Sequence, residues 1–186
     1  TVSPKVPLGP FVAGWRRARE LSGAVAASTT HIPGYLGFYA LPRADLLGIV
    51  EGAADAGVRY EGPVRKSQIG HVYDNFDIQL LILGRGRYVT SGKAYEYAAT
   101  GLPIVSVHDP TNAASDVLRG HPLWFPVTDL EPDSIAKALI AAAEAAQTAT
   151  SDVRRLARRF GARFRRDLQL DPRIDALRRS LEASHQ

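Results

Sequence analysis

The sequence predicts an α/β fold with a Rossmann-like, doubly wound parallel sheet, and two observations support this. First, apolar runs of strand length alternate with helical patterns across residues 35–147, an order typical of successive βα units. Second, the runs at 77–83 and 102–108 are largely apolar, as in parallel strands that are buried on both faces. The chain has 186 residues, 45% of them hydrophobic, which is enough for one domain with a substantial core.

Individual elements follow from local apolar spacing and from the glycines and prolines at element ends. The spacing predicts strands over residues 35–40, 58–62, 77–83, 102–108 and 123–127. It predicts helices over residues 11–22, 42–56, 67–75, 132–147, 151–166 and 173–183, with shorter ones after 90 and before 119. Residues 24–30 fit either a strand or a loop.

Three segments are expected along the chain. Three prolines in the first ten residues disfavour regular structure, so residues 1–23 are expected to be a linker and a short helix. Residues 24–150 form the Rossmann-like domain. Residues 151–186 are expected to be a basic helical tail packed on that domain, with a break at Asp171-Pro172.

Composition restricts the chemistry and the location of the protein. The chain has no cysteine and its five histidines are scattered, so we expect no metal centre and no cofactor. A formal net charge of +4 and a pI of about 9.6 favour anionic partners. No signal peptide and no apolar run of membrane-spanning length is evident, so a cytoplasmic location is expected.

Residues 151–166 are basic and amphipathic. Leu156, Phe160 and Phe164 share one helical face, and seven arginines occupy the remainder. The sequence favours a helix that docks this apolar face on the domain and leaves the basic face in solvent. The alternative is peripheral contact with an anionic membrane surface through residues 154–166, at the inner face of the membrane. No nucleic-acid partner is expected.

The loop and short helix that begin near residue 90 suit a phosphate group. Thr90 or Ser91 can cap the helix, whose first amides, including those of Gly92 and Lys93, are then unsatisfied donors. A capping box needs Glu or Gln at the position of Ala94, so at least one amide stays available for an outside acceptor. The helix dipole adds partial positive charge at this end.

Charged side chains accompany these amides. Arg85, Arg87 and Lys93 could add full positive charges. Glu96 lies about a turn and a half into the helix, where its carboxylate could accept hydrogen bonds from the two hydroxyls of a ribose. An alternative pairs Glu96 with Lys93 as an ordinary i, i+3 ion pair worth about 0.2–0.5 kcal/mol. The residues alone leave both interpretations open.

Other residues near this edge have structural explanations as well. His108 and Asp109 end a strand there, but a turn through Asp109-Pro110 explains them equally well. Tyr95 and Tyr97 lie on different helix faces, so we expect one of them in the core. Base stacking by the other is the alternative.

The segment TSGKAYEYAATGLPIV at 90–105 resembles the donor-site motif of retaining glycosyltransferases with the GT-B fold, of the group 1 or family 4 type. The motif combines Ser-Gly-Lys, Glu-Tyr-Ala and Gly-Leu-Pro at one spacing. The surrounding order is similar, from VRYEGPV at 58–64 to the strand opened by Asp77. The resemblance covers roughly residues 35–166. It implies the carboxy-terminal, nucleotide-sugar-binding half of such an enzyme, with a separate amino-terminal domain that binds the acceptor.

The resemblance implies a role for each matching position. Glu96 matches the glutamate that holds the donor ribose. Arg43 falls near the basic residue that neutralises the leaving diphosphate, although an exposed arginine at a helix start is the alternative. Arg43 and Lys93 are therefore the candidate catalytic residues. With the nearby arginines included, the candidate donor-binding residues are Thr90, Ser91, Gly92, Lys93, Glu96, Arg85 and Arg87.

Two positions depart from the family pattern. Many relatives carry another glutamate eight residues before the ribose glutamate, where this chain has Tyr88. They often carry an arginine directly after the first-strand glycine, where this chain has Phe38. The resemblance therefore implies nucleotide binding more directly than sugar contacts or leaving-group stabilisation.

The predicted function is hexosyl transfer, with retention, from a nucleoside-diphosphate sugar such as a UDP or GDP sugar to an acceptor, in polysaccharide or glycoconjugate biosynthesis. Alone, the chain is expected to bind the donor or hydrolyse it slowly. One alternative is a non-catalytic module that binds a nucleotide or nucleotide sugar, which Tyr88 and Phe38 support. Another alternative is a nucleotide-sugar epimerase-like domain. The sequence shows no arrangement of a histidine with a carboxylate that would favour it.

Overall fold

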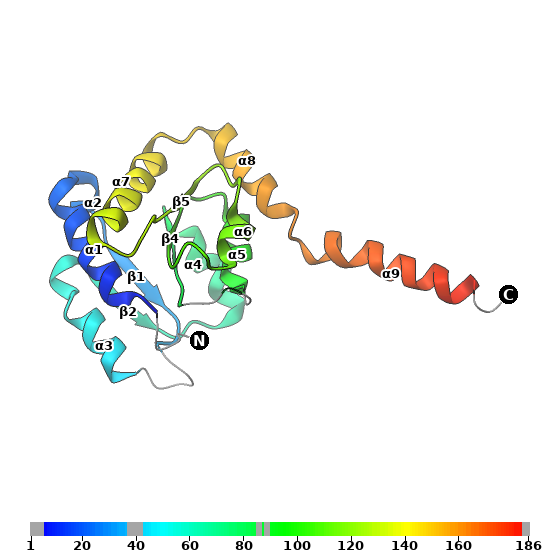
Figure 1. Cartoon of the computed structure of the whole chain (residues 1–186), viewed down its shortest axis with the longest axis horizontal. Helices are drawn as coiled ribbons and strands as arrows, with labels where there is room; N and C mark the ends of the chain where they lie inside the picture. Colours follow the sequence, from blue (N-terminus) through cyan, green and yellow to red (C-terminus); the bar gives the residue numbers. More distant parts are fainter. Residues whose placement is uncertain (1–5, 37–42, 85–86, 88–89, 184–186) are drawn as a thin grey trace.

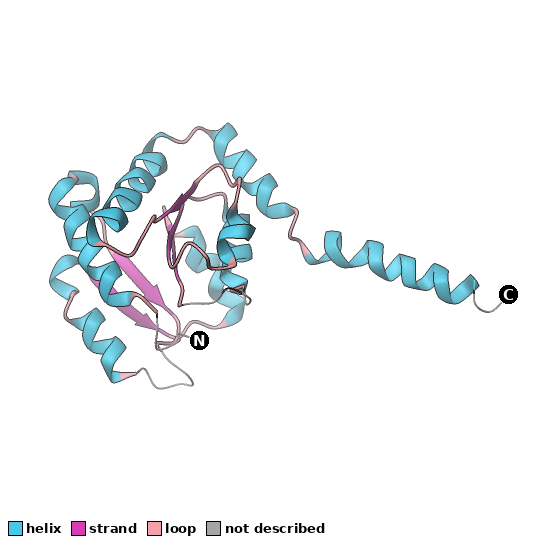
Figure 2. Ribbon diagram, viewed as in Figure 1, coloured by secondary structure: helices cyan, strands magenta, loops and turns pink. Residues whose placement is uncertain are grey.

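The protein has an α/β fold with two small parallel sheets (Figures 1 and 2). The computed structural model describes residues 6–36, 43–84, 87 and 90–183. In the first sheet β1 (Thr30–Pro33) pairs with β2 (Val58–Gly62). In the second, β4 (Ile104–Val107) lies between β3 (Gln79–Ile82) and β5 (Trp124–Pro126).

Helices separate these strands in the chain, as the alternating pattern predicts. They are α1 (Leu8–Leu21), α2 (Gly23–Ala26), α3 (Ala44–Glu51), α4 (Ile69–Asp74), α5 (Gly92–Thr100), α6 (Ala114–Leu118), α7 (Pro132–Thr148), α8 (Ser151–Ala162) and α9 (Arg166–Ala183). Short 3₁₀ turns at Ala54–Ala56 and Lys66–Gln68 precede β2 and α4.

The first strand forms earlier than the sequence predicts. The expectation for 35–40 is wrong at Tyr35 and Leu36, which lie outside any strand, and 37–40 fall outside the described residues. Thr30 instead donates its amide to the carbonyl of Gly57, 2.9 Å away, at the start of β1. Gly34 follows β1 with φ of +120°, a conformation that leaves the extended region and ends the strand.

Helix α1 begins inside the segment expected to be irregular. Pro10 is tolerated because it stands in the first turn, where backbone amides have no partner within the helix. The three apolar positions predicted for one face are buried, and they are Phe11, Trp15 and Ala18. They join α7 and β4 in the larger core cluster, and Trp15 Nε1 donates to the carbonyl of Ala56 over 2.8 Å.

The β3–α5–β4 unit forms as predicted. The two strands are parallel and in register, from Gln79 opposite Ile104 to Ile82 opposite Val107. Gly101 ends α5 in the left-handed conformation, with φ of +77°. The strands are buried between helices, so this unit is held on both faces.

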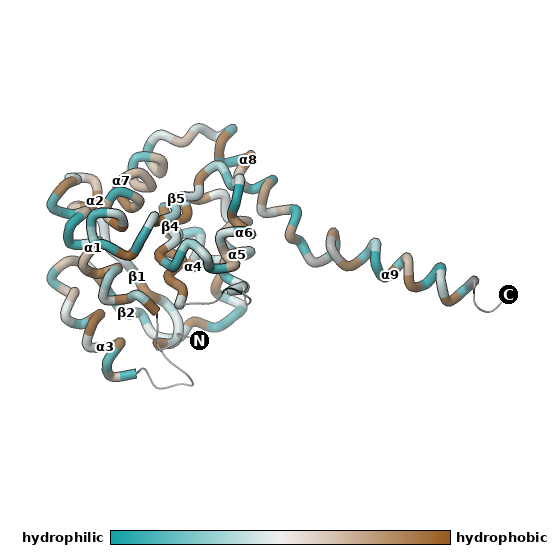
Figure 3. The backbone as a smooth tube through the Cα atoms, viewed as in Figure 1, coloured by the Kyte–Doolittle hydropathy of each residue, from teal (hydrophilic) through white to brown (hydrophobic). Residues whose placement is uncertain are grey.

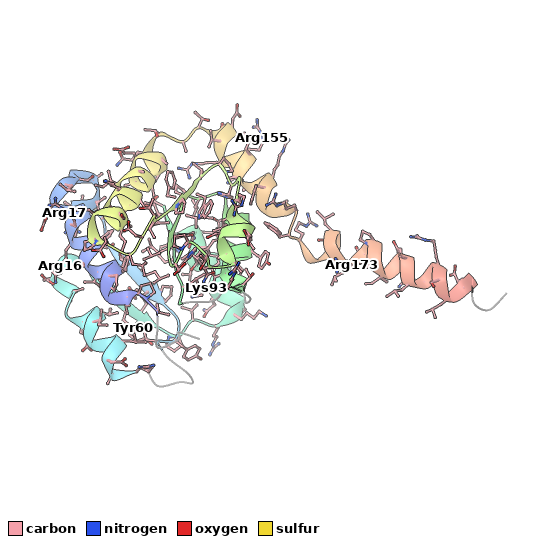
Figure 4. All side chains as sticks on the ribbon, viewed as in Figure 1. Arg16, Arg17, Tyr60, Lys93, Arg155 and Arg173 are labelled. Atoms are coloured by element: carbon pink, nitrogen blue, oxygen red, sulfur yellow. The ribbon has the colours of Figure 1, made fainter. Side chains whose placement is uncertain are left out.

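Helix α8 docks on α5, with one correction to the predicted apolar face. Phe160 and Phe164 pack on the smaller core cluster, but Leu156 is 54% exposed. Ala157 and Gly161 take the buried positions instead, because only small residues fit where α8 crosses α5. The outward face carries Arg155, labelled in Figure 4, and membrane contact through this face stays a prediction.

Helix α9 projects away from the rest of the protein (Figure 1). The predicted break at Asp171-Pro172 is wrong, because Pro172 lies inside the helix. The helix surface is exposed, so water can bind the carbonyl of Leu168, which proline leaves without its amide. Figure 3 shows polar and apolar residues interspersed along α9. Among the described residues, no helix has the length and apolar character needed to cross a membrane.

Candidate functional site

The candidate site lies where β3 and β4 end, because the carboxyl ends of parallel strands meet at one edge of a sheet. Asn112, which is 3% exposed, joins the loops that follow the two strands. Its Nδ2 donates to the carbonyl of Gly84 and its Oδ1 accepts from the amide of Ala114, both over 2.9 Å. These bonds tie Gly84, just beyond β3, to the turn that follows β4.

His108 and Asp109 serve the turn after β4. The Oδ1 of Asp109 accepts from the backbone amide of Thr111 at 2.9 Å and from its hydroxyl at 2.7 Å, as in an Asx turn. His108 is 2% exposed, and burial lowers the pKa of its imidazole. The predicted turn through Asp109 is therefore present, with Nδ1 of His108 2.9 Å from the carbonyl of Asp109.

Within the described part of the chain, the backbone amide of Gly92 has no hydrogen-bond partner at the start of α5. Ser91 is the N-cap, and its Oγ accepts from the amide of Lys93 at 3.3 Å. The carbonyl of Ser91 accepts from the amide of Ala94 at 3.0 Å. The amide of Gly92 forms no hydrogen bond with any described residue. Gly92 is exposed and a side chain there would meet open space, so an anion can approach this amide.

Glu96 lies on the exposed side of α5 and is held by a residue from another helix. Tyr73 of α4 donates its phenol proton to Oε2 of Glu96 over 2.9 Å. The ring of Tyr73 meets that of Tyr97 edge to face, with centroids 5.4 Å apart. The described contacts include no ion pair within 4.0 Å between Glu96 and Lys93, although the charge of Glu96 still acts to raise the pKa of Lys93.

Lys93 supplies the nearest full positive charge. Lys93 is exposed, and partial desolvation lowers the pKa of its ammonium group, while the charge of Glu96 opposes that shift. Arg87 is exposed as well, and Thr90 and Ser91 are half-buried beside the helix start.

Arg43 is not brought to this helix. It is the N-cap of α3, which packs against β2 and α1, whereas α5 packs against α8, α6 and β3. Its guanidinium binds Asp45 through Nη2 at 2.6 Å and Nε at 3.0 Å. The hydrogen bonds to Asp45 raise the pKa of Arg43. In this structure Arg43 therefore serves an exposed ion pair at a helix start.

Three positions of interest lie outside the described residues. They are Arg85, Tyr88 and Phe38. Of the two tyrosines on α5, Tyr97 is 8% exposed and belongs to the core, while Tyr95 is 38% exposed and its ring meets Phe164. The expectation that one of them lies in the core is confirmed.

Tyr73 and Asn112 are site residues that sequence reasoning missed. Asn112 stands in a polar segment, from which the sequence predicts a turn. That pattern gave no indication that its side chain would bind the carbonyl of Gly84. Nothing in the sequence around Tyr73 indicated a role at the site, because its partner Glu96 lies 23 positions further along, on another helix.

Metal ligands do not gather at this edge among the described residues. No three metal-ligating side chains converge anywhere in the described part of the chain. A shallow depression lies far along the chain, on α9 alone, and is lined by Asp167, Leu168, Asp171, Pro172, Asp175 and Arg179. In comparisons with known proteins, no family model matches the chain, and neither does any curated protein.

Proposed function

We propose that this protein is the donor-binding domain of a retaining glycosyltransferase and binds a nucleoside-diphosphate sugar at the amino-terminal end of α5. The observation that carries the proposal is the pairing of two features on one helix. Gly92 offers an open amide at the helix start, and Glu96 presents a fixed carboxylate further along. A diphosphate and a ribose diol require this order of donor and acceptor.

The fold supports the proposal at a coarser level. The parallel β3–α5–β4 unit places the start of α5 at the carboxyl end of β3, where open α/β sheets bind ligands. The finer assignment, a doubly wound sheet forming the carboxy-terminal half of a GT-B fold, is part of the proposal. So are the acceptor-binding domain and the cytoplasmic location.

The chemistry would rest mainly on electrostatics and positioning. When the bond between the anomeric carbon and the diphosphate breaks, negative charge grows on the leaving phosphate oxygens. The Gly92 amide, the α5 dipole and Lys93 stabilise that charge. Glu96 holds the ribose, which fixes the donor relative to these groups. Arg43 could contribute only if its guanidinium left Asp45 and bound the diphosphate instead.

A non-catalytic nucleotide-binding module is the second candidate. The bidentate pairing of Arg43 with Asp45, on a helix that packs mainly against β2 and α1, favours it. Both candidate functions use the same donor site. Only the transferase needs a positive charge beside the leaving diphosphate.

Calorimetric titration with UDP-, GDP- and ADP-linked sugars tests the site. We expect the wild type to bind at least one of them, and Glu96→Ala to weaken that binding about tenfold or more, because hydrogen bonds to a charged group contribute about 1.5–3 kcal/mol. Glu144→Ala is the matched control, since Glu144 is an exposed glutamate on α7. Binding that survives Glu96→Ala unchanged would contradict the assignment.

Arg43→Ala separates the two candidates. Donor hydrolysis by the wild type that falls in Arg43→Ala, with donor affinity retained, supports a transferase. Equal hydrolysis in both proteins supports the binding module, because Arg43 then acts only in its pair with Asp45.

A further inference from the structure

Tyr73 joins α4 to the candidate site through a single hydrogen bond. Its hydroxyl donates to Oε2 of Glu96 over 2.9 Å, although the two residues are 23 positions apart. We propose that Tyr73 is a positioning residue that holds the Glu96 carboxylate in the orientation that accepts the ribose hydroxyls. This inference rests on the proposed function and adds a residue that sets the preference for ribose.

The core fixes the ring of Tyr73. It meets the ring of Tyr97 at an interplanar angle of 85°, and Tyr97 is 8% exposed within the smaller core cluster. Tyr73 is half-buried against the same cluster. The hydroxyl is therefore placed by packed aromatic rings, and a long exposed side chain such as Glu96 gains a fixed partner.

Tyr73 can only donate in this contact. Burial, with smaller contributions from Tyr97 and Glu96, raises the pKa of its phenol above the ordinary value of 10, so the proton stays in place at neutral pH. The hydrogen bond occupies one of about four acceptor positions on a carboxylate. Oε1 forms no hydrogen bond with the described residues, which leaves room for two hydroxyls of a ligand.

Pre-ordering of Glu96 has a measurable consequence. A glutamate without this bond would lose side-chain freedom on binding, and that loss would weaken affinity for any ligand that needs its carboxylate. A ligand that lacks the hydroxyl would be affected less. Tyr73 should therefore increase the preference for a ribonucleotide over its 2′-deoxy form.

A double-mutant cycle tests the inference in the whole chain. Wild type, Tyr73→Phe, Glu96→Ala and the double variant are titrated with UDP, GDP and ADP and with their 2′-deoxy forms. Phenylalanine keeps the ring against Tyr97 and removes only the donor. We expect Tyr73→Phe to raise the Kd of the ribonucleotide about three- to tenfold, to reduce the ribo-to-deoxy preference, and to have no further effect beside Glu96→Ala.

Controls separate this result from a loss of structure. Tyr60→Phe removes the hydroxyl of a half-buried tyrosine on β2, outside the candidate site, and should leave both affinities unchanged. The thermal midpoint of Tyr73→Phe should stay within a few degrees of the wild type. The role of Tyr73 is overturned, and the donor site stands, if Glu96→Ala weakens binding while Tyr73→Phe does not. The same conclusion follows if Tyr73→Phe weakens binding equally in the wild type and in Glu96→Ala. If Glu96→Ala has no effect, the proposed function itself fails.

Discussion

At the scale of single residues, burial of His121 links folding to pH. His121 is 5% exposed, its Nδ1 accepts from the amide of Leu123 at 3.2 Å, and its ring meets Phe160 edge to face. Burial, assisted by the charge of Arg163, lowers the pKa of the imidazole to about 4. The carbonyl of Ala98 opposes this shift, but it forms no hydrogen bond of good geometry with Nε2.

This depressed pKa predicts a loss of stability in mild acid. The unfolded chain takes up the proton near the ordinary pKa of 6.5, whereas the folded protein takes it up near 4. Stability is therefore full above pH 6.5 and falls as the pH drops toward 4. Relative to His121→Asn, which keeps an acceptor and does not titrate, we expect the wild type to lose about 1–2 kcal/mol between pH 7 and pH 5 in urea unfolding. If the unfolding free energies of the wild type and His121→Asn changed in parallel with pH, the predicted role of His121 would be wrong.

At the scale of elements, the crossing of α5 and α8 depends on Gly161. A Cβ at this position would lie 2.2 Å from the backbone oxygen of Ala98, which cannot move without displacing α5. Beyond this crossing, Tyr95 of α5 meets Phe164, which follows α8, edge to face with ring centroids 5.1 Å apart. The close approach therefore comes from one missing side chain.

The same contact predicts opposite effects of two glycine-to-alanine substitutions. Gly161→Ala should destabilise the fold by about 1–3 kcal/mol, because the added methyl group forces the helices apart. Gly48→Ala in α3 is the matched control, since a Cβ there meets nothing within 4 Å. It should stabilise the protein by about 0.5–1 kcal/mol through helix propensity. If Gly161→Ala and Gly48→Ala changed the unfolding free energy equally in denaturant, α5 and α8 would be less closely packed at Gly161 than the structure shows.

At the scale of the whole molecule, α8 and α9 contribute differently to the fold. Helix α8 shares the smaller core cluster with β3, β4 and α5 through Phe160 and Phe164. Every described side chain of α9 is exposed, and the helix stands apart from the body (Figure 1). The tail is therefore part of the domain as far as α8 and an appendage beyond it.

Two truncations should distinguish these roles. A chain that ends after Arg165 lacks α9 and should keep the urea midpoint of the full protein. A chain that ends after Thr150 also lacks α8, exposes the smaller cluster, and should lose about 2–4 kcal/mol. A large loss in the shorter deletion would mean that α9 contacts the body in solution.

What the sequence by itself determined is local. Neighbouring residues predict a cap at Thr90 or Ser91 and apolar strands on either side of α5, and the structure has Ser91 as the cap between two parallel strands. The alternation of strands and helices likewise predicts parallel pairing. Local patterns suffice here because caps, glycine ends and periodicity act over a few residues.

Only the tertiary structure decided which side chains meet. Tyr73 reaches Glu96 across 23 positions, and Asn112 reaches Gly84 across 28 positions. Arg43 stays with its neighbour Asp45, two positions away. Spacing along the chain carries no record of these choices, because the packing of helices on the sheets sets the distances between residues far apart in sequence.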